Sequence, residues 1–183
     1  MNVLALDAAG RFSLTALRRS DETFYATSVY GQGAVRAVYS SVDQVLETGG
    51  LKVSDLDAIV VNTGPGSWTA TRIAVTYTAG LAFGAGLRVY GYSGFALGKR
   101  IDARGVAFID QLGKTVAEEG AGDAGFIVNL FVNEDGASYL ADRRAWMDEM
   151  LKLGAEALAA GEPGDPLELR TTYFQEFLAG ARN

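Results

Sequence analysis

The chain has 183 residues, of which 49% are hydrophobic and 21% are charged, and its net charge is −6. This length predicts one domain or two small lobes that share a core, and the apolar content suffices for folding without metal or disulfide support. Cysteine and histidine are both absent, which excludes disulfides, thiolate zinc sites, thiol catalysis and Ser-His-Asp chemistry. Basic residues form no dense tract, so we expect no direct binding of nucleic acid by the chain alone.

The same features bear on location. Residues 1–7 lack the basic start and the long apolar run of a secretory signal. The most apolar internal segment, residues 73–87, is shorter than the ~20 residues that span a bilayer. We therefore expect a cytoplasmic protein with no membrane association.

Residues 1–100 predict three strands followed by alternating helices and strands. Alternating or continuous apolar runs favour the strands, and an i, i+3, i+7 pattern favours the first helix. A meander followed by right-handed crossovers would give a mixed five-stranded sheet. The expected strands are Val3–Leu6, Arg11–Leu17, Thr23–Val29, Ala58–Asn62 and Arg88–Tyr92, and the expected helices are Gly33–Glu47, Trp68–Ala85 and a helix from Ser93 to about Arg100.

The helix Trp68–Ala85 has an unusual composition. Arg72 is its only charged residue, and Asp, Glu, Lys and Arg are all absent from residues 73–87. A surface helix normally has one polar face. Such a helix is either enclosed in a large core or covered on one side by another chain, and we favour the second reading because a small domain encloses few helices fully.

The loop before this helix is a candidate anion site. A turn through Gly64-Pro65-Gly66, followed by a Ser67 cap, leaves free N–H groups at a helix start, which favour an anion or a closely docked backbone. The alternative is an ordinary strand-to-helix turn in which Gly64 or Gly66 supplies a positive φ angle.

Asp7 closes the first strand and precedes Ala8-Ala9-Gly10. The order of elements resembles the ribonuclease-H-like half-domain of actin and Hsp70, whose first hairpin carries a phosphate loop. This resemblance implies that Asp7 could align a metal-bound water, although neither alanine provides a hydroxyl. The alternative is that its carboxylate accepts hydrogen bonds from turn amides. The candidate nucleotide or anion contacts are therefore Asp7, Gly64, Gly66 and Ser67; we predict no catalytic residue and no metal site.

Residues 101–183 predict a smaller second lobe, joined to a lobe of residues 1–100. We expect a hairpin, an amphipathic helix and a C-terminal tail that docks on the body. The expected segments are a short helix within Val106–Glu118, a buried strand Gly125–Val132, a turn Asn133–Gly136, a return strand Ser138–Ala141, a helix Ala145–Ala160, a linker Gly161–Pro166, and a tail comprising Leu167–Arg170 and Tyr173–Leu178.

Several motifs together carry a family resemblance. They are Leu4–Asp7, Gly50–Leu51, Asp55–Val61, Gly64–Thr69, Arg72–Ala74, Ala79–Ala82, Gly91–Ser93 and Pro166–Arg170 followed by Tyr173. The chain resembles the TsaB (YeaZ) family, bacterial relatives of TsaD, most specifically over Leu51–Ala82. The departures from the family pattern indicate a divergent member or a paralogue with a changed role: Ala8-Ala9 replaces the family's Thr-Ser, Trp68 replaces Phe, and Asn133-Glu134-Asp135 replaces Asp-Ala-Arg.

The resemblance implies an α/β chain with the ribonuclease-H-like fold of actin-like ATPases and a reduced second lobe. It also implies a non-catalytic scaffold or activating subunit that works with TsaD-like and TsaE-like proteins in tRNA threonylcarbamoyladenosine synthesis. TsaD would supply the metal and the active site. No cofactor is expected, and ATP or ADP would bind only at the partner interface.

The resemblance further places a TsaD-like partner, or a second copy of the chain in a homodimer, on a bundle formed by two helices. The alternative for each interface candidate is a place in the chain's own core, so we expect only part of the set to face a partner. The candidates are Val35, Val38, Tyr39 and Val42 from the first helix and Arg72, Ile73, Val75 and Tyr77 from the second.

Two other functions stay open at this point. An autonomous ATPase or small-molecule kinase of the same fold would need a second phosphate loop and a Gly-Gly adenosine motif, and the segment 120–125 lacks the expected preceding strand. A peptidase without His or Cys would need a Ser-Lys or paired-carboxylate mechanism, and no residue spacing suggests either.

Overall fold

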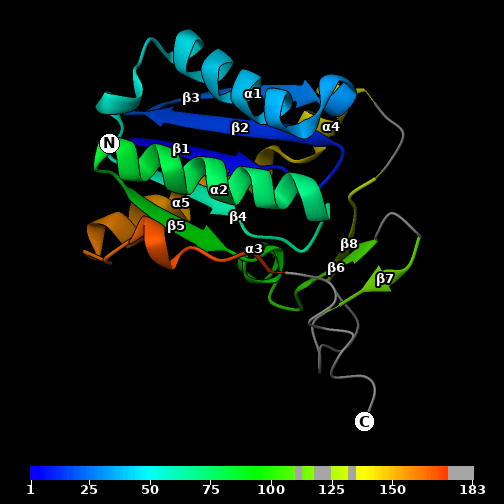
Figure 1. Cartoon of the computed structure of the whole chain (residues 1–183). Coiled ribbons are helices and arrows are strands. Elements are labelled where there is room, and N and C mark those ends of the chain that lie inside the picture. The colour runs from blue at the N-terminus through cyan, green and yellow to red at the C-terminus, as the bar shows by residue number, and fades with distance from the viewer. Residues whose placement is uncertain (110–112, 118–124, 132–134, 173–183) are drawn as a thin grey trace.

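A mixed five-stranded sheet is the centre of the fold (Figure 1). The computed structural model describes residues 1–109, 113–117, 125–131 and 135–172. The strand order is β3-β2-β1-β4-β5, in which β1, β2 and β3 form an antiparallel meander and β1, β4 and β5 are parallel. The sheet confirms the predicted ribonuclease-H-like α/β class. The strands are β1 Asn2–Asp7, β2 Phe12–Arg19, β3 Glu22–Val29, β4 Ala58–Asn62 and β5 Arg88–Tyr92.

Helices cover both faces of this sheet. Helices α1 (Ala34–Gly49) and α2 (Trp68–Ala85) lie side by side on one face, and α5 (Arg144–Ala159) packs on the other (Figure 1). Side chains of a strand alternate between faces, so Leu4 and Leu6 of β1 pack beneath α1 and α2, while Val3 and Ala5 belong to the core around α5. Burial on both faces explains why β1 and β4 are continuously apolar.

Local signals at both ends fix the bounds of α2. The Ser67 hydroxyl accepts a hydrogen bond from the N–H of Ala70, and Gly86 ends the helix in the left-handed conformation with φ 68°. The observed helix has the bounds predicted from the sequence. Helix α1 ends in the same way at Gly50, with φ 65°, two residues later than predicted.

The predicted short helix within residues 106–118 is wrong for the part that the structure describes. Strands β6 (Val106–Ile109) and β7 (Thr115–Val116) occupy it, and with β8 (Phe126–Asn129) they form a second sheet in the order β7-β6-β8. The apolar run of β6 pairs in parallel with β8. Gly113, with φ 77°, lies in a conformation that does not continue a helix. The predicted buried strand over residues 125–132 is confirmed in part: β8 covers only Phe126–Asn129, Ile127 is exposed, and Leu130 and Phe131 lie in a turn.

The predicted return strand Ser138–Ala141 is also wrong, because it lies in helix α4 (Gly136–Asp142). The Asp135 carboxylate accepts hydrogen bonds from the N–H groups of Ala137 and Ser138. This N-cap supports a helix where the sequence favoured a hairpin. Residues 133 and 134 of the predicted turn lie outside the described residues.

The C-terminal tail docks along the free edge of β5. The Gly164 carbonyl accepts a hydrogen bond from the N–H of Val89, and the N–H of Thr172 donates to the Thr63 carbonyl at 2.6 Å. This confirms the predicted docking as far as Thr172, and it covers an edge strand whose backbone groups would otherwise be unpaired. Residues 173–178 of the predicted tail lie outside the described residues.

The remaining described elements are short. They are helix α3 (Gly94–Ile101) and the 3-10 turns Tyr30–Gln32, Val53–Asp55 and Pro166–Glu168. Helix α5 confirms the predicted amphipathic helix at 145–160, and it packs on the five-stranded sheet although it follows β6, β7 and β8 in the chain. The division into lobes at residue 100 stays a prediction. Within the described part of the chain, no helix has both the length and the apolar character needed to cross a membrane.

Two helical glycines offer a matched test of this packing. A Cβ atom at Gly154 of α5 would overlap Val60 of β4, whereas one at Gly80 of α2 would meet nothing within 4 Å. We expect Gly154→Ala to lower the free energy of unfolding by about 1–3 kcal/mol through overpacking. Gly80→Ala should raise it by about 0.5–1 kcal/mol through helix propensity. Urea denaturation measures both, and equal midpoints for the two variants would contradict the packing of α5.

Candidate protein-interaction surface

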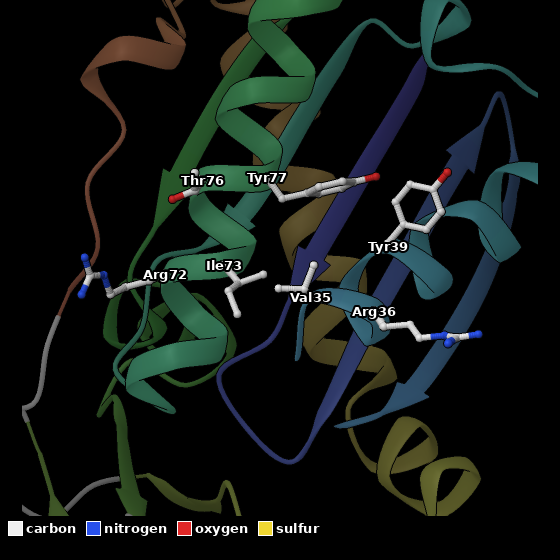
Figure 2. A pocket seen from close by; sticks show the side chains of 7 residues that line it. All are labelled: Val35, Arg36, Tyr39, Arg72, Ile73, Thr76 and Tyr77. Carbon is white, nitrogen blue, oxygen red and sulfur yellow. The ribbon is translucent and has the colours of Figure 1, made fainter. Parts of the chain in front are cut away.

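An open groove of about 640 Å³ lies between α1 and α2 on the side away from the sheet (Figure 2). In Figure 2, Val35 and Ile73 point toward one another from the two helices, and Tyr77 extends toward Tyr39, while the two arginines extend away from the centre. The groove therefore has an apolar floor between two cationic ends. It is lined by Val35, Arg36, Tyr39, Arg72, Ile73, Thr76 and Tyr77.

The two tyrosines form one aromatic unit in this groove. Their ring centroids are 6.4 Å apart in an edge-to-face arrangement, with an interplanar angle of 78°. Burial, followed by the negative charge of Asp43 and the neighbouring Tyr39, raises the pKa of Tyr77 to about 12. The Tyr77 phenol is therefore neutral at physiological pH and adds no charge to the groove.

The outward face of α2 continues the groove along the helix. Trp68 is 50% exposed at its start and Phe83 is 70% exposed near its end. The Arg72 guanidinium lies 5.5 Å from the centre of the Trp68 ring. Between the two aromatic residues, a Cβ at Gly80 would meet no atom within 4 Å. The part of the chain that the structure describes therefore leaves one face of this apolar helix uncovered.

The structure divides the eight predicted interface residues into two groups. Val38, Val42 and Val75 are buried, at 0%, 1% and 6% exposure, in the core between the helices and the sheet. These three predictions are corrected, because the helical period turns them toward the sheet. The residues that lie at the surface or line the groove are Val35, Tyr39, Arg72, Ile73 and Tyr77.

Sequence reasoning missed the two most exposed aromatic residues of α2. Arg72 could have predicted them, because the only charged residue of a helix indicates the side that faces water. Trp68 lies one helical turn before Arg72, and Gly80 lies two turns after it. The line through Trp68, Arg72 and Gly80, continued along the helix, ends beside Phe83.

The candidate anion-binding loop is filled by the chain's own backbone. The N–H of Ser67 donates to the Ala9 carbonyl at 2.7 Å, and the N–H of Gly64 donates to Oδ1 of Asn62 at 2.9 Å. Gly64 has φ 106°, and a Cβ at Gly66 would overlap the Ala9 carbonyl. This geometry agrees with the ordinary-turn alternative, in which glycine permits a positive φ angle and a close approach.

Asp7 is buried at the end of β1 and is held by three donors of the chain. Its carboxylate accepts hydrogen bonds from the N–H of Ala9 at 2.8 Å, from Nδ2 of Asn62 at 2.9 Å and from Nε1 of Trp146 at 2.9 Å. The bond from Ala9 confirms the turn-amide alternative. The contribution of Trp146 was missed, and no local pattern connects residues so distant in sequence. Nucleotide contacts at Asp7, Gly64, Gly66 and Ser67 stay a prediction.

Metal ligation has little support in the described portion of the chain. There, no group of three or more His, Cys, Asp or Glu side chains is placed to hold a metal ion. The interaction surface between α1 and α2 is therefore the strongest candidate site on the molecule.

Comparison with known proteins gives partial sequence matches, one of which includes this region. The TsaD family, described as tRNA N6-adenosine threonylcarbamoyltransferase, matches residues 33–96, which include α1 and α2. The TsaB protein of Haemophilus influenzae is 30% identical over 89 residues, which are 49% of this chain and 38% of that protein. The TsaB protein of Escherichia coli is 30% identical over 93 residues, which are 51% of this chain and 40% of that protein. Each match thus spans less than half of the relative's own length.

Solved structures show a likeness of fold over 94% of the chain. The structure of YeaZ from Pseudomonas aeruginosa has a TM-score of 0.68 at 19% identity and covers 94% of this chain and 99% of its own. A second Pseudomonas aeruginosa structure, titled as similar to peptidase YeaZ, has a TM-score of 0.67 at 21% identity, with 94% and 98% coverage. These structures share the fold. The chain is thus similar to TsaB proteins in sequence over about half of its length, and to YeaZ structures in fold over 94% of it.

Proposed function

We propose that this chain is a non-catalytic scaffold or activating subunit in tRNA threonylcarbamoyladenosine biosynthesis, and that α1 and α2 bind a TsaD-like protein. The observation that carries the proposal is the uncovered apolar groove between these helices. The TsaB names of the sequence relatives support the pathway. A TsaE-like protein is the further partner that this role requires.

The composition of the groove suits a protein partner. Trp, Tyr and Arg dominate the binding energy of protein interfaces, and the groove and its margin present Trp68, Tyr39 and Arg72. Burying one large apolar side chain stabilises by about 1.5–3 kcal/mol, whereas association costs ~4–15 kcal/mol. Several of these side chains must therefore be buried together, as in an interface of about 1,600 Å².

The face of α2 also permits close approach by a partner helix. Thr76 and Gly80 place only small side chains between the aromatic residues at either end. Among the described residues, no atom of another element lies within 4 Å of a Cβ placed at Gly80 or Gly84. A partner helix can therefore cross at this point with its backbone close to α2, while Tyr39 and Phe83 pack on either side.

Reconstitution tests the role directly. Purified TsaD-like and TsaE-like proteins, given tRNA, threonine, bicarbonate and ATP, should form the modified nucleoside far faster when this chain is added. Mass spectrometry of digested tRNA measures the product. Equal rates with and without the chain would overturn the proposal.

Arg72→Glu should weaken binding of the TsaD-like protein by at least about tenfold, or ~1.4 kcal/mol. The change removes the guanidinium beside the Trp68 ring and forces a carboxylate to lose water at an apolar contact. Arg88→Glu, on β5, is the matched control, because Arg88 is exposed away from the groove. Calorimetric titration measures both variants, with circular dichroism to check folding. Unchanged affinity for Arg72→Glu would count against this interface.

Substitutions at two valines of α1 distinguish an effect on partner binding from an effect on folding. Val35 is 67% exposed and Val38 is fully buried. We expect Val35→Asp to change unfolding free energy by no more than about 0.5 kcal/mol while it abolishes partner binding at micromolar concentration. Val38→Asp should destabilise the fold by about 3 kcal/mol or more, since it buries an unpaired charge. Retained binding by a folded Val35→Asp variant would show that the partner docks elsewhere.

A further inference from the structure

A second cavity, of about 230 Å³, lies on the other side of the sheet from the α1–α2 groove. Most of its wall is apolar and includes Phe108, Leu130 and Val128. The rings of Tyr139 and Trp146 complete an aromatic lining with Phe108. Phe108 and Trp146 meet edge to face, with ring centroids 6.1 Å apart. The three aromatic side chains come from three different elements, β6, α4 and α5, and the proposed partner interface uses none of them.

The cavity is lined by more negatively charged side chains than positively charged ones. Asp7 and Asp142 line it with carboxylates, and Arg143 is the one cation among its lining residues in the part of the chain that the structure describes. The Arg143 guanidinium lies over the Tyr139 ring at 3.6 Å and donates to the backbone carbonyl of Asn129 at 2.7 Å. This charge is therefore held against the wall, and the lining as a whole carries one net negative charge.

The negative charge of the cavity matters for ligand binding because the Asp7 carboxylate is buried. Asp7 is 7% exposed, and its three donors are two neutral side chains and one backbone N–H. Across the described residues it takes part in no ion pair. Coulomb attraction is stronger in a poorly hydrated site than in water, so an entering cation gains more Coulomb energy here than at the surface, which offsets its loss of hydration.

We propose that this cavity binds a small organic cation, a protonated amine or quaternary ammonium group attached to an apolar body. The carboxylate of Asp7 pairs with the positive charge, and the aromatic wall of Phe108 and Trp146 stabilises both the cation and its apolar part. Asp142 also lines the cavity and is exposed, and its carboxylate favours the same sign of charge.

The size and charge of the site argue against a nucleotide as its occupant. Pockets that enclose drug-sized ligands typically measure ~300–1,000 Å³, so this cavity suits a smaller molecule. A phosphate group would also lie beside a buried carboxylate, where like charges repel strongly.

Three probes that share one carbon skeleton test the charge preference. They are phenethylammonium, which is cationic, 2-phenylethanol, which is neutral, and phenylacetate, which is anionic. Trp146 fluorescence reports binding in a Trp68→Phe background, since the chain has two tryptophans. We expect phenethylammonium to bind about tenfold more tightly than 2-phenylethanol, and phenylacetate to bind most weakly. An equal or reversed order, or no saturable binding of phenethylammonium at millimolar concentration, would overturn the proposal.

Variants then assign the preference to the cavity. Asp7→Asn should remove most of the advantage of the cationic probe over the neutral one. Asp142→Asn, at an exposed position, should reduce that advantage about two- to threefold without loss of folding, so the test survives if Asp7→Asn fails to fold. Tyr39→Ser, in the other groove, is the control and should leave all three affinities unchanged. Displacement of phenethylammonium by magnesium-ATP would instead identify a nucleotide site and refute the proposal.

Discussion

Helix α2 packs against the sheet on one side and is exposed on the other although both sides are apolar, and much of the structure follows from that constraint. Its inner side is built of small residues such as Ala70, Ala74 and Ala82, which let the helix backbone lie close to the sheet. Its outer side has one charge and two exposed aromatic residues. A helix with so little polar surface cannot be well hydrated on the outside, so the fold that places α2 against the sheet also creates the exposed apolar face on which we propose that a partner docks.

The end of β1 joins the two sides of the molecule. The turn after β1 presents the Ala9 carbonyl to Ser67 at the start of α2, and Asp7 accepts a hydrogen bond from Trp146 at the start of α5. Helices α2 and α5, on opposite faces of the sheet, are thus hydrogen-bonded to Ala9 and Asp7, which are two residues apart in the chain. The groove and the aromatic cavity share this anchor but no lining residue, which is why each can be perturbed separately.

Local pattern explains which parts the sequence could predict. The N-terminal sheet and α2 follow from periodicity, a Ser67 cap and a glycine stop at Gly86, all of which act within a few residues. The same periodicity groups helix residues into stripes without saying which stripe faces the sheet, and Val38, Val42 and Val75 were misplaced for that reason. The region after residue 105 depends on pairing between β6 and β8, which is not a local property.

The first loop shows how distant contacts change the meaning of a motif. A carboxylate followed by hydroxyl residues would leave donors and acceptors for a phosphate, but here Ala8 and Ala9 provide only backbone groups. Those groups are used within the chain, by Ser67 through the Ala9 carbonyl and by Tyr30, whose hydroxyl donates to the Ala8 carbonyl at 2.9 Å. The loop therefore acts as a structural joint. Beside the loop, the Asp7 carboxylate and the aromatic rings line the second cavity. A carboxylate and aromatic rings favour a cationic ligand, whereas the loop motif alone suggested an anionic one.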